Sequence, residues 1–211
     1  TVLVTKDKAI LWTDGRYFLQ AEKQLEGSVV ELYKMMEPGV PTINEFLKAN
    51  LKKGEKLGMD GKVVAVSSFD SMEKELEGIE LVTNIDLIGE IWENRPQAVL
   101  SEAFILEEKY TGKSAKEKIE EVRSMLAEKK ADSTVIGALE DVCYLFNVRG
   151  RDVRCNPVVT AYAIVDKTRA IIFISEKQLT DKVKSYFASQ GITVMGYEDV
   201  FAEAKNLKGT V

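Results

Sequence analysis

Residues 4–12 read Val-Thr-Lys-Asp-Lys-Ala-Ile-Leu-Trp, and residues 165–173 read Val-Asp-Lys-Thr-Arg-Ala-Ile-Ile-Phe. In both stretches a polar turn separates two apolar segments, which is the pattern of a β-hairpin. Each stretch is followed by the patterns of a helix, a strand and a second helix, in the same order. Because the order of elements matches as well as the residues, we infer that an α/β unit is duplicated within the chain.

Apolar periodicity and turn residues predict the elements of the first half of the chain. Thr42 and Glu45 have the spacing of a capping box at the start of a helix. Strands that alternate with helices favour an α/β layered fold. The predicted elements are strands at 1–5 and 9–12, a helix at 17–25, a strand at 29–35, a helix at 42–53, a strand at 56–59, a helix near 69–76 and a strand at 80–82.

A second α/β series begins at Ser114, which has the spacing of another capping box with Glu117. Residues 97–112 carry no clear period, so we expect a linker there, between domains at 1–96 and 113–211. The predicted elements of the second domain are a helix from Ser114 to about Lys130, a strand at 134–136, a helix at 139–147, strands at 158–165 and 170–174, a helix at 179–187, a strand at 192–195 and a helix at 200–207.

The composition excludes several kinds of function. The 211 residues include no His, so a Ser-His-Asp or Cys-His centre and a His-ligated zinc cannot form within the chain. The net charge of -5 argues against a nucleic-acid partner. No apolar run approaches the ~20 residues of a membrane span, and the first residues lack the features of a signal peptide. We therefore expect a cytoplasmic protein in which Cys143 and Cys155 are reduced.

The two ends of the chain suggest a piece of a longer protein. The chain begins at Thr1, without Met and within a predicted strand. It ends at Val211, where another strand pattern starts. We expect an excised fragment.

The first candidate for a site is the stretch Asp14-Gly15-Arg16, between the end of a predicted strand and the start of a predicted helix. Ligand-binding groups collect at such positions in α/β sheets. The alternative is structural: Asp14 caps the helix, and Arg16 pairs with it at the surface. The spacing alone favours this alternative, because an Asp at a helix start is usually a cap.

The second candidate is the long connection at residues 145–157. It contains three of the seven arginines of the chain, Arg149, Arg151 and Arg154. Such a concentration of guanidinium groups in an acidic chain predicts binding of an anion or a carboxylate. In the alternative, the loop satisfies itself, with Asp152 bonded to the arginines and Asn side chains closing turns.

Several stretches resemble segments of the cytosolic, three-domain Xaa-Pro aminopeptidases of the creatinase/prolidase superfamily. The resemblance begins with WTDGRYFLQA at Trp12–Ala21 and follows the order of that family over nearly the whole chain. Arg151 stands where the family pattern has a small residue, so the resemblance implies no role for it. The other matching stretches are Asp86–Trp92 with Arg95 and Pro96, Tyr110–Ser114 with Lys118, Ile119 and Arg123, Ala138–Gly150, and Asn156–Val159 with Tyr162–Ile164.

The resemblance implies a fold and a place in a larger enzyme. Two creatinase N-terminal-like domains, with mixed sheets flanked by helices, would lie in tandem, and the first would lack its N-terminal part. In the family these domains are non-catalytic, control substrate access and support assembly. The metal-binding and catalytic residues lie in a third, C-terminal pita-bread domain with a dinuclear metal centre, often manganese. We therefore expect no metal, no cofactor and no catalytic residue within this chain.

The resemblance also implies residues near a substrate. The Asp-Gly-Arg-Tyr turn of the first domain lies close to the catalytic pocket in the family, which makes Arg16 a substrate-side candidate. Asn147 and Arg149 are further candidates, expected in the corresponding loop of the second domain. The residues expected to be structural in these two motifs are Asp14, Gly15, Tyr17, Gly150, Asp152, Asn156 and Pro157.

The expected activity of the parent protein is removal of the N-terminal residue from peptides with Pro in second position. Its expected partners are the C-terminal domain of the same chain, short Pro-containing peptides and further copies in a homo-oligomer, without nucleic acid or membrane. The alternative is a scaffold that keeps a peptidase-like architecture for protein contacts, as in the peptidase-like domain of a histone chaperone. Metal ligands of the Asp-Asp-His-Glu-Glu type elsewhere in the protein would distinguish the enzyme from the scaffold.

Overall fold

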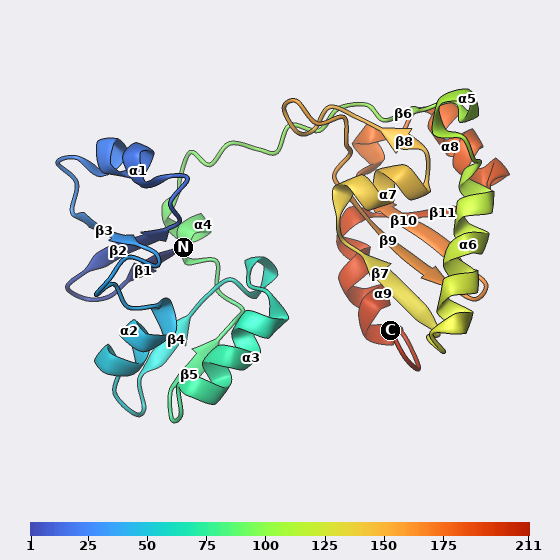
Figure 1. Cartoon of the computed structure of the whole chain (residues 1–211). Helices are drawn as coiled ribbons and strands as arrows, with labels where there is room; N and C mark the ends of the chain where they lie inside the picture. Colours follow the sequence, from blue (N-terminus) through green and yellow to red (C-terminus); the bar gives the residue numbers. More distant parts are fainter. The chain divides into compact units, whose positions relative to one another are not determined.

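The computed structural model describes all 211 residues, which form two compact units. The first unit comprises residues 1–96 and the second comprises residues 97–211. In Figure 1 the first unit is coloured from blue to green and the second from green to red. The division falls directly after Pro96, where the first predicted domain ends.

The first unit is built on a three-stranded sheet with the order β1-β2-β3. Strand β1 (Val2–Val4) is antiparallel to β2 (Ala9–Thr13), as the hairpin pattern predicts. Helix α1 (Phe18–Leu25) then returns the chain, so that β3 (Val30–Lys34) is parallel to β2.

The core of the first unit gathers around Trp12, which is 2% exposed. Phe46 of helix α2 (Ile43–Asn50) covers it, with the two ring centroids 5.5 Å apart in an edge-on arrangement. The indole Nε1 of Trp12 donates a hydrogen bond of 2.8 Å to the carbonyl oxygen of Pro41. This bond satisfies the polar end of a buried ring and fixes the loop that precedes α2.

A smaller layer completes the first unit. Strands β4 (Lys56–Gly58) and β5 (Glu80–Val82) form a two-stranded parallel sheet, and helix α3 (Val66–Glu75) connects them. Helix α4 (Leu87–Ile91), which the sequence pattern did not predict, begins where the Asp86 side chain accepts a hydrogen bond from the backbone N–H of Gly89.

The second unit contains a four-stranded mixed sheet with the order β11-β10-β9-β7. Strand β9 (Ala161–Asp166) is antiparallel to both β7 (Ser133–Ile136) and β10 (Ala170–Ile174). Strand β11 (Thr193–Met195) is parallel to β10 and forms the outer edge. The strand predicted at 158–165 thus begins three residues later than expected.

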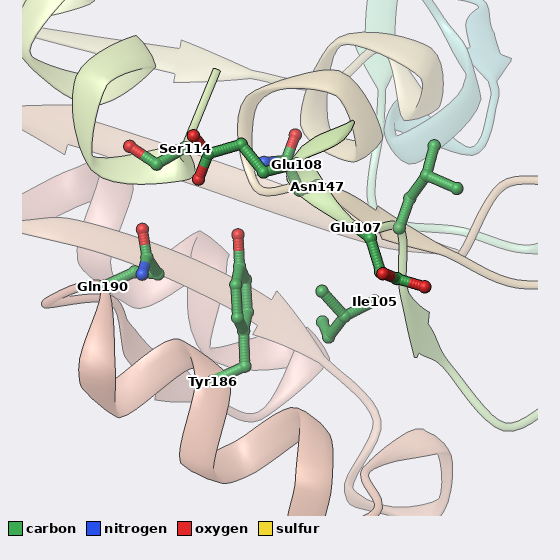
Figure 2. Close-up of a pocket in the computed structure, with 8 residues that line it drawn as sticks. Ile105, Glu107, Glu108, Ser114, Asn147, Tyr186 and Gln190 are labelled. Carbon is green, nitrogen blue, oxygen red and sulfur yellow. The ribbon is translucent and has the colours of Figure 1, made fainter. Parts of the chain in front are cut away.

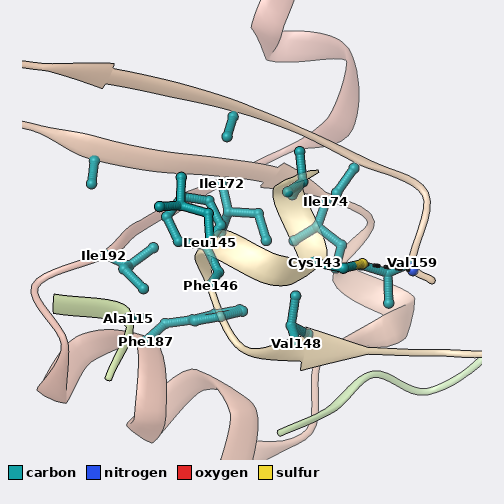
Figure 3. Packing of buried hydrophobic residues seen from close by; sticks show 14 of the residues in the cluster. Ala115, Cys143, Leu145, Phe146, Val148, Val159, Ile172, Ile174, Phe187 and Ile192 are labelled. Atoms are coloured by element: carbon teal, nitrogen blue, oxygen red, sulfur yellow. Dashed lines mark hydrogen bonds between the residues drawn. The ribbon is translucent and has the colours of Figure 1, made fainter. Parts of the chain in front are cut away.

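Each face of this sheet has its own apolar core. Helices α6 (Ala115–Glu128), α7 (Leu139–Leu145) and α8 (Asp181–Ser189) cover one face. Figure 3 shows side chains of α7 packed against Ile172 and Ile174 in that cluster. Helix α9 (Val200–Asn206) covers the other face, where the buried strand residues are Ile164, Ile171 and Phe173.

The strand register confirms the duplication. Val4 pairs with Ala9 in the first unit, and Val165 pairs with Ala170 in the second. In both units a helix then leads to a parallel strand and a second helix, α2 or α9. The hairpin turns match as well, because the side chain of the first turn residue accepts backbone N–H bonds from two residues that follow it. These turn residues are Thr5, with Asp7 and Lys8, and Asp166, with Thr168 and Arg169.

The structure differs from the predicted linker at 97–112. All of this segment belongs to the second unit, where strand β6 (Phe104–Ile105) is antiparallel to β8 (Val148–Arg149) and α5 (Glu108–Thr111) follows. Ala103 is buried, and its backbone N–H donates to the carbonyl oxygen of Gln178. These partners lie more than forty residues away in the sequence, so local periodicity gave no sign of them.

Candidate functional site

The Asp-Gly-Arg-Tyr turn follows β2 and precedes α1, at the carboxyl end of β2. Arg16 forms a two-point ion pair with Asp14, with 2.8 Å from Nε to Oδ1 and 2.9 Å from Nη2 to Oδ2. This pair lowers the pKa of Asp14 to about 2. The Arg16 side chain is 79% exposed and lies over the ring of Tyr17.

Only part of the structural alternative for this turn is realised. Arg16 pairs with Asp14 at the surface, but Asp14 does not cap α1, whose N-cap residue is Tyr17 and has no side-chain cap bond. Instead, Asp14 Oδ1 accepts the backbone N–H of Arg16, 3.1 Å away. A Cβ added at Gly15 would meet nothing closer than 3.8 Å, so packing alone does not require Gly there.

The expected correspondence between the two candidate loops is wrong. Because β10 is the counterpart of β2, the loop that corresponds to residues 14–17 is residues 175–178. Asn147 and Arg149 instead lie before β9, between α7 and the end of β8. The two candidate stretches are therefore different parts of the duplicated unit.

Asn147 ends α7 in a left-handed conformation, with φ at 53°, and is 1% exposed. Its Oδ1 accepts a 2.7 Å hydrogen bond from Nζ of Lys118, and its Nδ2 donates a 2.9 Å bond to the carbonyl oxygen of Lys113. Both ends of the amide are thus bonded within the chain. Asn is among the residues that tolerate this backbone conformation best.

Lys118 lies beside the candidate residue Asn147, and the sequence analysis gave it no role of its own. It is 2% exposed, and Nζ also donates to the carbonyl oxygen of Tyr144, 2.8 Å away, and lies 3.8 Å from the centroid of the Tyr144 ring. Burial lowers the pKa of Lys118, and the nearby Arg149 lowers it further. One signal was available, since Lys118 shares a helical face with Val122 and Leu126, which places it toward the core.

Arg149 stands at the end of β8 and is half-buried. Its Nη1 donates to the carbonyl oxygens of Cys143, at 2.5 Å, and Val148, at 2.9 Å. No carboxylate pairs with Arg149, and the N–H groups of Nε and Nη2 donate to no group of the chain. The backbone next to it is closely packed, because a Cβ at Gly150 would lie 2.6 Å from Cγ1 of Val159.

Asp152 binds neutral groups rather than the arginines. Its Oδ1 accepts from N and Oγ of Ser101, and its Oδ2 accepts from N of Thr160 and Nε2 of Gln178, all at 2.7–2.8 Å. Burial raises the pKa of Asp152, but these hydrogen bonds outweigh it and the pKa is lowered. The alternative in which Asp152 is bonded to the arginines of the loop is therefore not realised.

The end of the connection is held by a tight turn. Val153 and Asn156 face each other in an isolated bridge, with Cys155 left-handed between them at a φ of 63°. Asn156 Nδ2 donates a 2.7 Å hydrogen bond to Oε1 of Glu140, and Pro157 then leads toward β9. The side chain of Asn156 thus holds the turn to α7.

A cleft of about 250 Å³ lies beside Asn147 in the second unit. Figure 2 shows Tyr186 of α8 and Gln190, which directly follows this helix, on one side, with Ser114 and Asn147 opposite. Burial raises the pKa of the Tyr186 hydroxyl. The cleft offers neutral hydrogen-bonding groups and two carboxylates at its rim, Glu107 and Glu108.

The residues of this chain do not fit a metal centre. No three side chains of the His, Cys, Asp or Glu types lie where they could hold one ion together.

The helices are also too short or too polar for any of them to cross a bilayer.

Comparison with known proteins identifies both units. A model of the creatinase/prolidase N-terminal domain matches residues 94–210, and a second model with the same description matches residues 1–95. The chain belongs to this family. It contains two creatinase N-terminal domains in tandem, as the resemblance implied.

Similar full-length proteins carry the name Xaa-Pro aminopeptidase. Xaa-Pro aminopeptidase 1 of Dictyostelium discoideum is 36% identical over 97% of this chain, and a probable Xaa-Pro aminopeptidase P of Coprinopsis cinerea is 39% identical over 97%. An X-prolyl aminopeptidase structure from Caenorhabditis elegans, described as a cytosolic enzyme with a di-nuclear active site, matches 97% of the chain with a TM-score of 0.92 and 31% identity. The chain spans about a third of the length of each of these proteins, 34%, 33% and 34% respectively.

Proposed function

We propose that this chain forms two non-catalytic domains of an Xaa-Pro aminopeptidase, a metallohydrolase that removes the first residue from peptides with Pro in second position. The observation that supports this most strongly is similarity over 97% of the chain to proteins of that name, at 39% identity for the C. cinerea relative. In this proposal the two units wall the path of short Pro-containing peptides and support assembly of a homo-oligomer.

The catalytic metals of the proposed enzyme would be bound outside these 211 residues, in a C-terminal domain of the same polypeptide. The C. elegans protein is described as having a di-nuclear active site, and the present chain has no His and no suitable cluster of carboxylates. We propose manganese as the metal. We also propose a cytoplasmic location, in line with the cytosolic C. elegans enzyme.

Arg16 and Arg149 are the proposed substrate-side groups, because each guanidinium keeps donors that no group of the chain uses. For Arg16 the free group is Nη1, and for Arg149 it is Nε and Nη2. A guanidinium fork matches the geometry of a peptide carboxylate or carbonyl. Asn147 is proposed to act indirectly, since its amide is bonded to Lys118 and Lys113 and so fixes the backbone that carries Arg149.

The metal content of the full-length protein tests this proposal and separates it from the scaffold alternative. We expect close to two metal ions per chain, measured by elemental analysis of the purified protein, and restoration of activity by Mn²⁺ after chelation. A folded full-length protein that binds no metal would support the scaffold instead.

A further inference from the structure

Four of the seven arginines have a carboxylate partner within the chain. Arg16 pairs with Asp14, Arg95 with Asp86, Arg123 with Glu120, and Arg169 with Asp166 and Glu203. The other three have no ion pair, and all three lie within six residues of one loop. We call this the basic loop, residues 149–156, with Arg149, Arg151 and Arg154.

The carboxylates closest to the basic loop are engaged elsewhere. Asp152, which lies within it, is saturated by four hydrogen bonds from Ser101, Thr160 and Gln178. Glu140 accepts the amide of Asn156. Neither carboxylate therefore forms an ion pair with an arginine of the loop, which keeps three arginines against the single carboxylate of Asp152.

The backbone of the loop is held in place, while the side chains of Arg151 and Arg154 have no ion pair. The backbone N–H of Arg151 donates a 2.6 Å hydrogen bond to Oγ of Ser101, and the bridge between Val153 and Asn156 closes the turn that carries Arg154. Arg151 and Arg154 are both exposed. A fixed backbone that presents free guanidinium groups loses less entropy when an anion binds than a flexible one does.

The charge of the whole chain restricts which anion can bind. With a net charge of -5, the chain repels extended polyanions, and its three arginines without an ion pair lie together in one loop. A short ligand with a few carboxylates matches this surface, because each guanidinium can bind a carboxylate by two parallel hydrogen bonds. We propose that the basic loop binds the carboxylates of an acidic peptide segment, with Arg151 and Arg154 as the principal contacts.

Synthetic peptides distinguish the side-chain carboxylates of an acidic segment from a C-terminal carboxylate. One labelled hexapeptide would carry four Glu residues and an amidated C-terminus, and a second would carry Gln in place of Glu and a free C-terminal carboxylate. Binding to the 211-residue chain is measured by fluorescence anisotropy at low salt. We expect the Glu peptide to bind more tightly than the Gln peptide, and added salt to weaken its binding because the contacts are ionic and exposed. Tighter binding of the Gln peptide would contradict the proposal.

The double variant Arg151→Ala/Arg154→Ala is expected to weaken binding at least tenfold. Lys116→Ala/Lys182→Ala is the matched control, since it removes two exposed cations without ion pairs from the same unit, and it should leave affinity within twofold. Arg151→Gln/Arg154→Gln serves if the alanine variant unfolds. Equal binding by wild type and the arginine variants, no binding of either peptide at millimolar concentration, or equal affinity for inorganic phosphate would overturn the proposal.

Discussion

Arg16 donates two hydrogen bonds to Asp14 and is otherwise largely exposed. A surface pair of this kind contributes little to stability, so its loss should leave the fold intact. Removing one charge-assisted contact to a substrate costs roughly 1.5–3 kcal/mol. We therefore expect Arg16→Ala in the full-length protein to lower kcat/KM for short X-Pro peptides by roughly one to two orders of magnitude.

Arg16→Lys is the informative companion, because it keeps the charge and loses the fork. It should recover only part of the activity, with metal content and melting temperature unchanged in both variants. If kcat/KM of Arg16→Ala equals that of the wild type, or if its loss follows a lowered melting temperature, Arg16 serves only its ion pair with Asp14.

Lys118 stabilises the junction between α6 and the end of α7. Lys118→Met keeps most of the apolar volume but leaves Oδ1 of Asn147 without its lysine donor, whereas the carbonyl oxygen of Tyr144 keeps a backbone donor from Phe146. An unsatisfied buried acceptor costs about 1–3 kcal/mol, so urea unfolding should show a loss in this range. Lys116→Met, on an exposed position of the same helix, is the control and should change stability by less than about 0.5 kcal/mol. A loss no larger than that of the control would contradict the role given to Lys118.

The same lysine predicts a pH dependence. Burial lowers the pKa of Lys118 in the folded state, so between that pKa and the unfolded value of about 10.4 the unfolded chain binds more protons. Stability conferred by this group therefore rises with pH through that window. The difference in unfolding free energy between wild type and Lys118→Met should accordingly grow in alkaline buffer, and a constant difference would show that the pKa is not lowered.

At the residue scale, sequence could predict contacts between near neighbours only. The pair of Asp14 and Arg16 was expected from a spacing of two residues, and both capping boxes were expected from a spacing of three. The partners of Asp152 lie 51, 26 and 8 residues away along the sequence. Only the folded chain brings them next to Asp152, so their contacts could not be predicted from local spacing. The functional meaning of Arg16, Asn147 and Arg149 stays a prediction.

At the scale of elements, Gly150 determines how closely the chain after β8 approaches the irregular segment that leads into β9. A Cβ there would lie 2.6 Å from Cγ1 of Val159 and 3.1 Å from the carbonyl oxygen of Val158. Gly150→Ala should therefore destabilise the second unit by roughly 1–3 kcal/mol, measured by urea unfolding. Gly137→Ala is the control, because its nearest neighbour is the Tyr162 ring at 3.8 Å, and equal stability of the two variants would contradict the packing argument.

Elements with a strong local pattern were predictable, and those defined by distant partners were not. The two hairpins and the amphipathic helices follow from apolar periodicity. Strands β6 and β8 have two residues each and exist because they pair across more than forty residues of chain. Their pairing ties the expected linker at 97–112 to the second unit.

At the scale of the whole molecule, the two copies of the unit differ in how well their sheets are covered. Val2 and Val4 of β1 are 57% and 68% exposed, whereas their counterparts Ala163 and Val165 of β9 are fully buried. Exposed apolar area on a sheet contributes no burial energy. Residues 97–211 expressed alone should therefore unfold at a higher urea concentration than residues 1–96, and the reverse order would contradict this comparison.

The central claim is that these two domains belong to an Xaa-Pro aminopeptidase and provide none of its metal ligands. The most direct measurement is release of the N-terminal residue from a short X-Pro peptide, by the full-length protein and by the 211-residue chain, with and without a chelator. We expect chelator-sensitive hydrolysis by the full-length protein and none by the chain. Chelator-sensitive hydrolysis by the chain alone, or none by a folded, metal-loaded full-length protein, would contradict it.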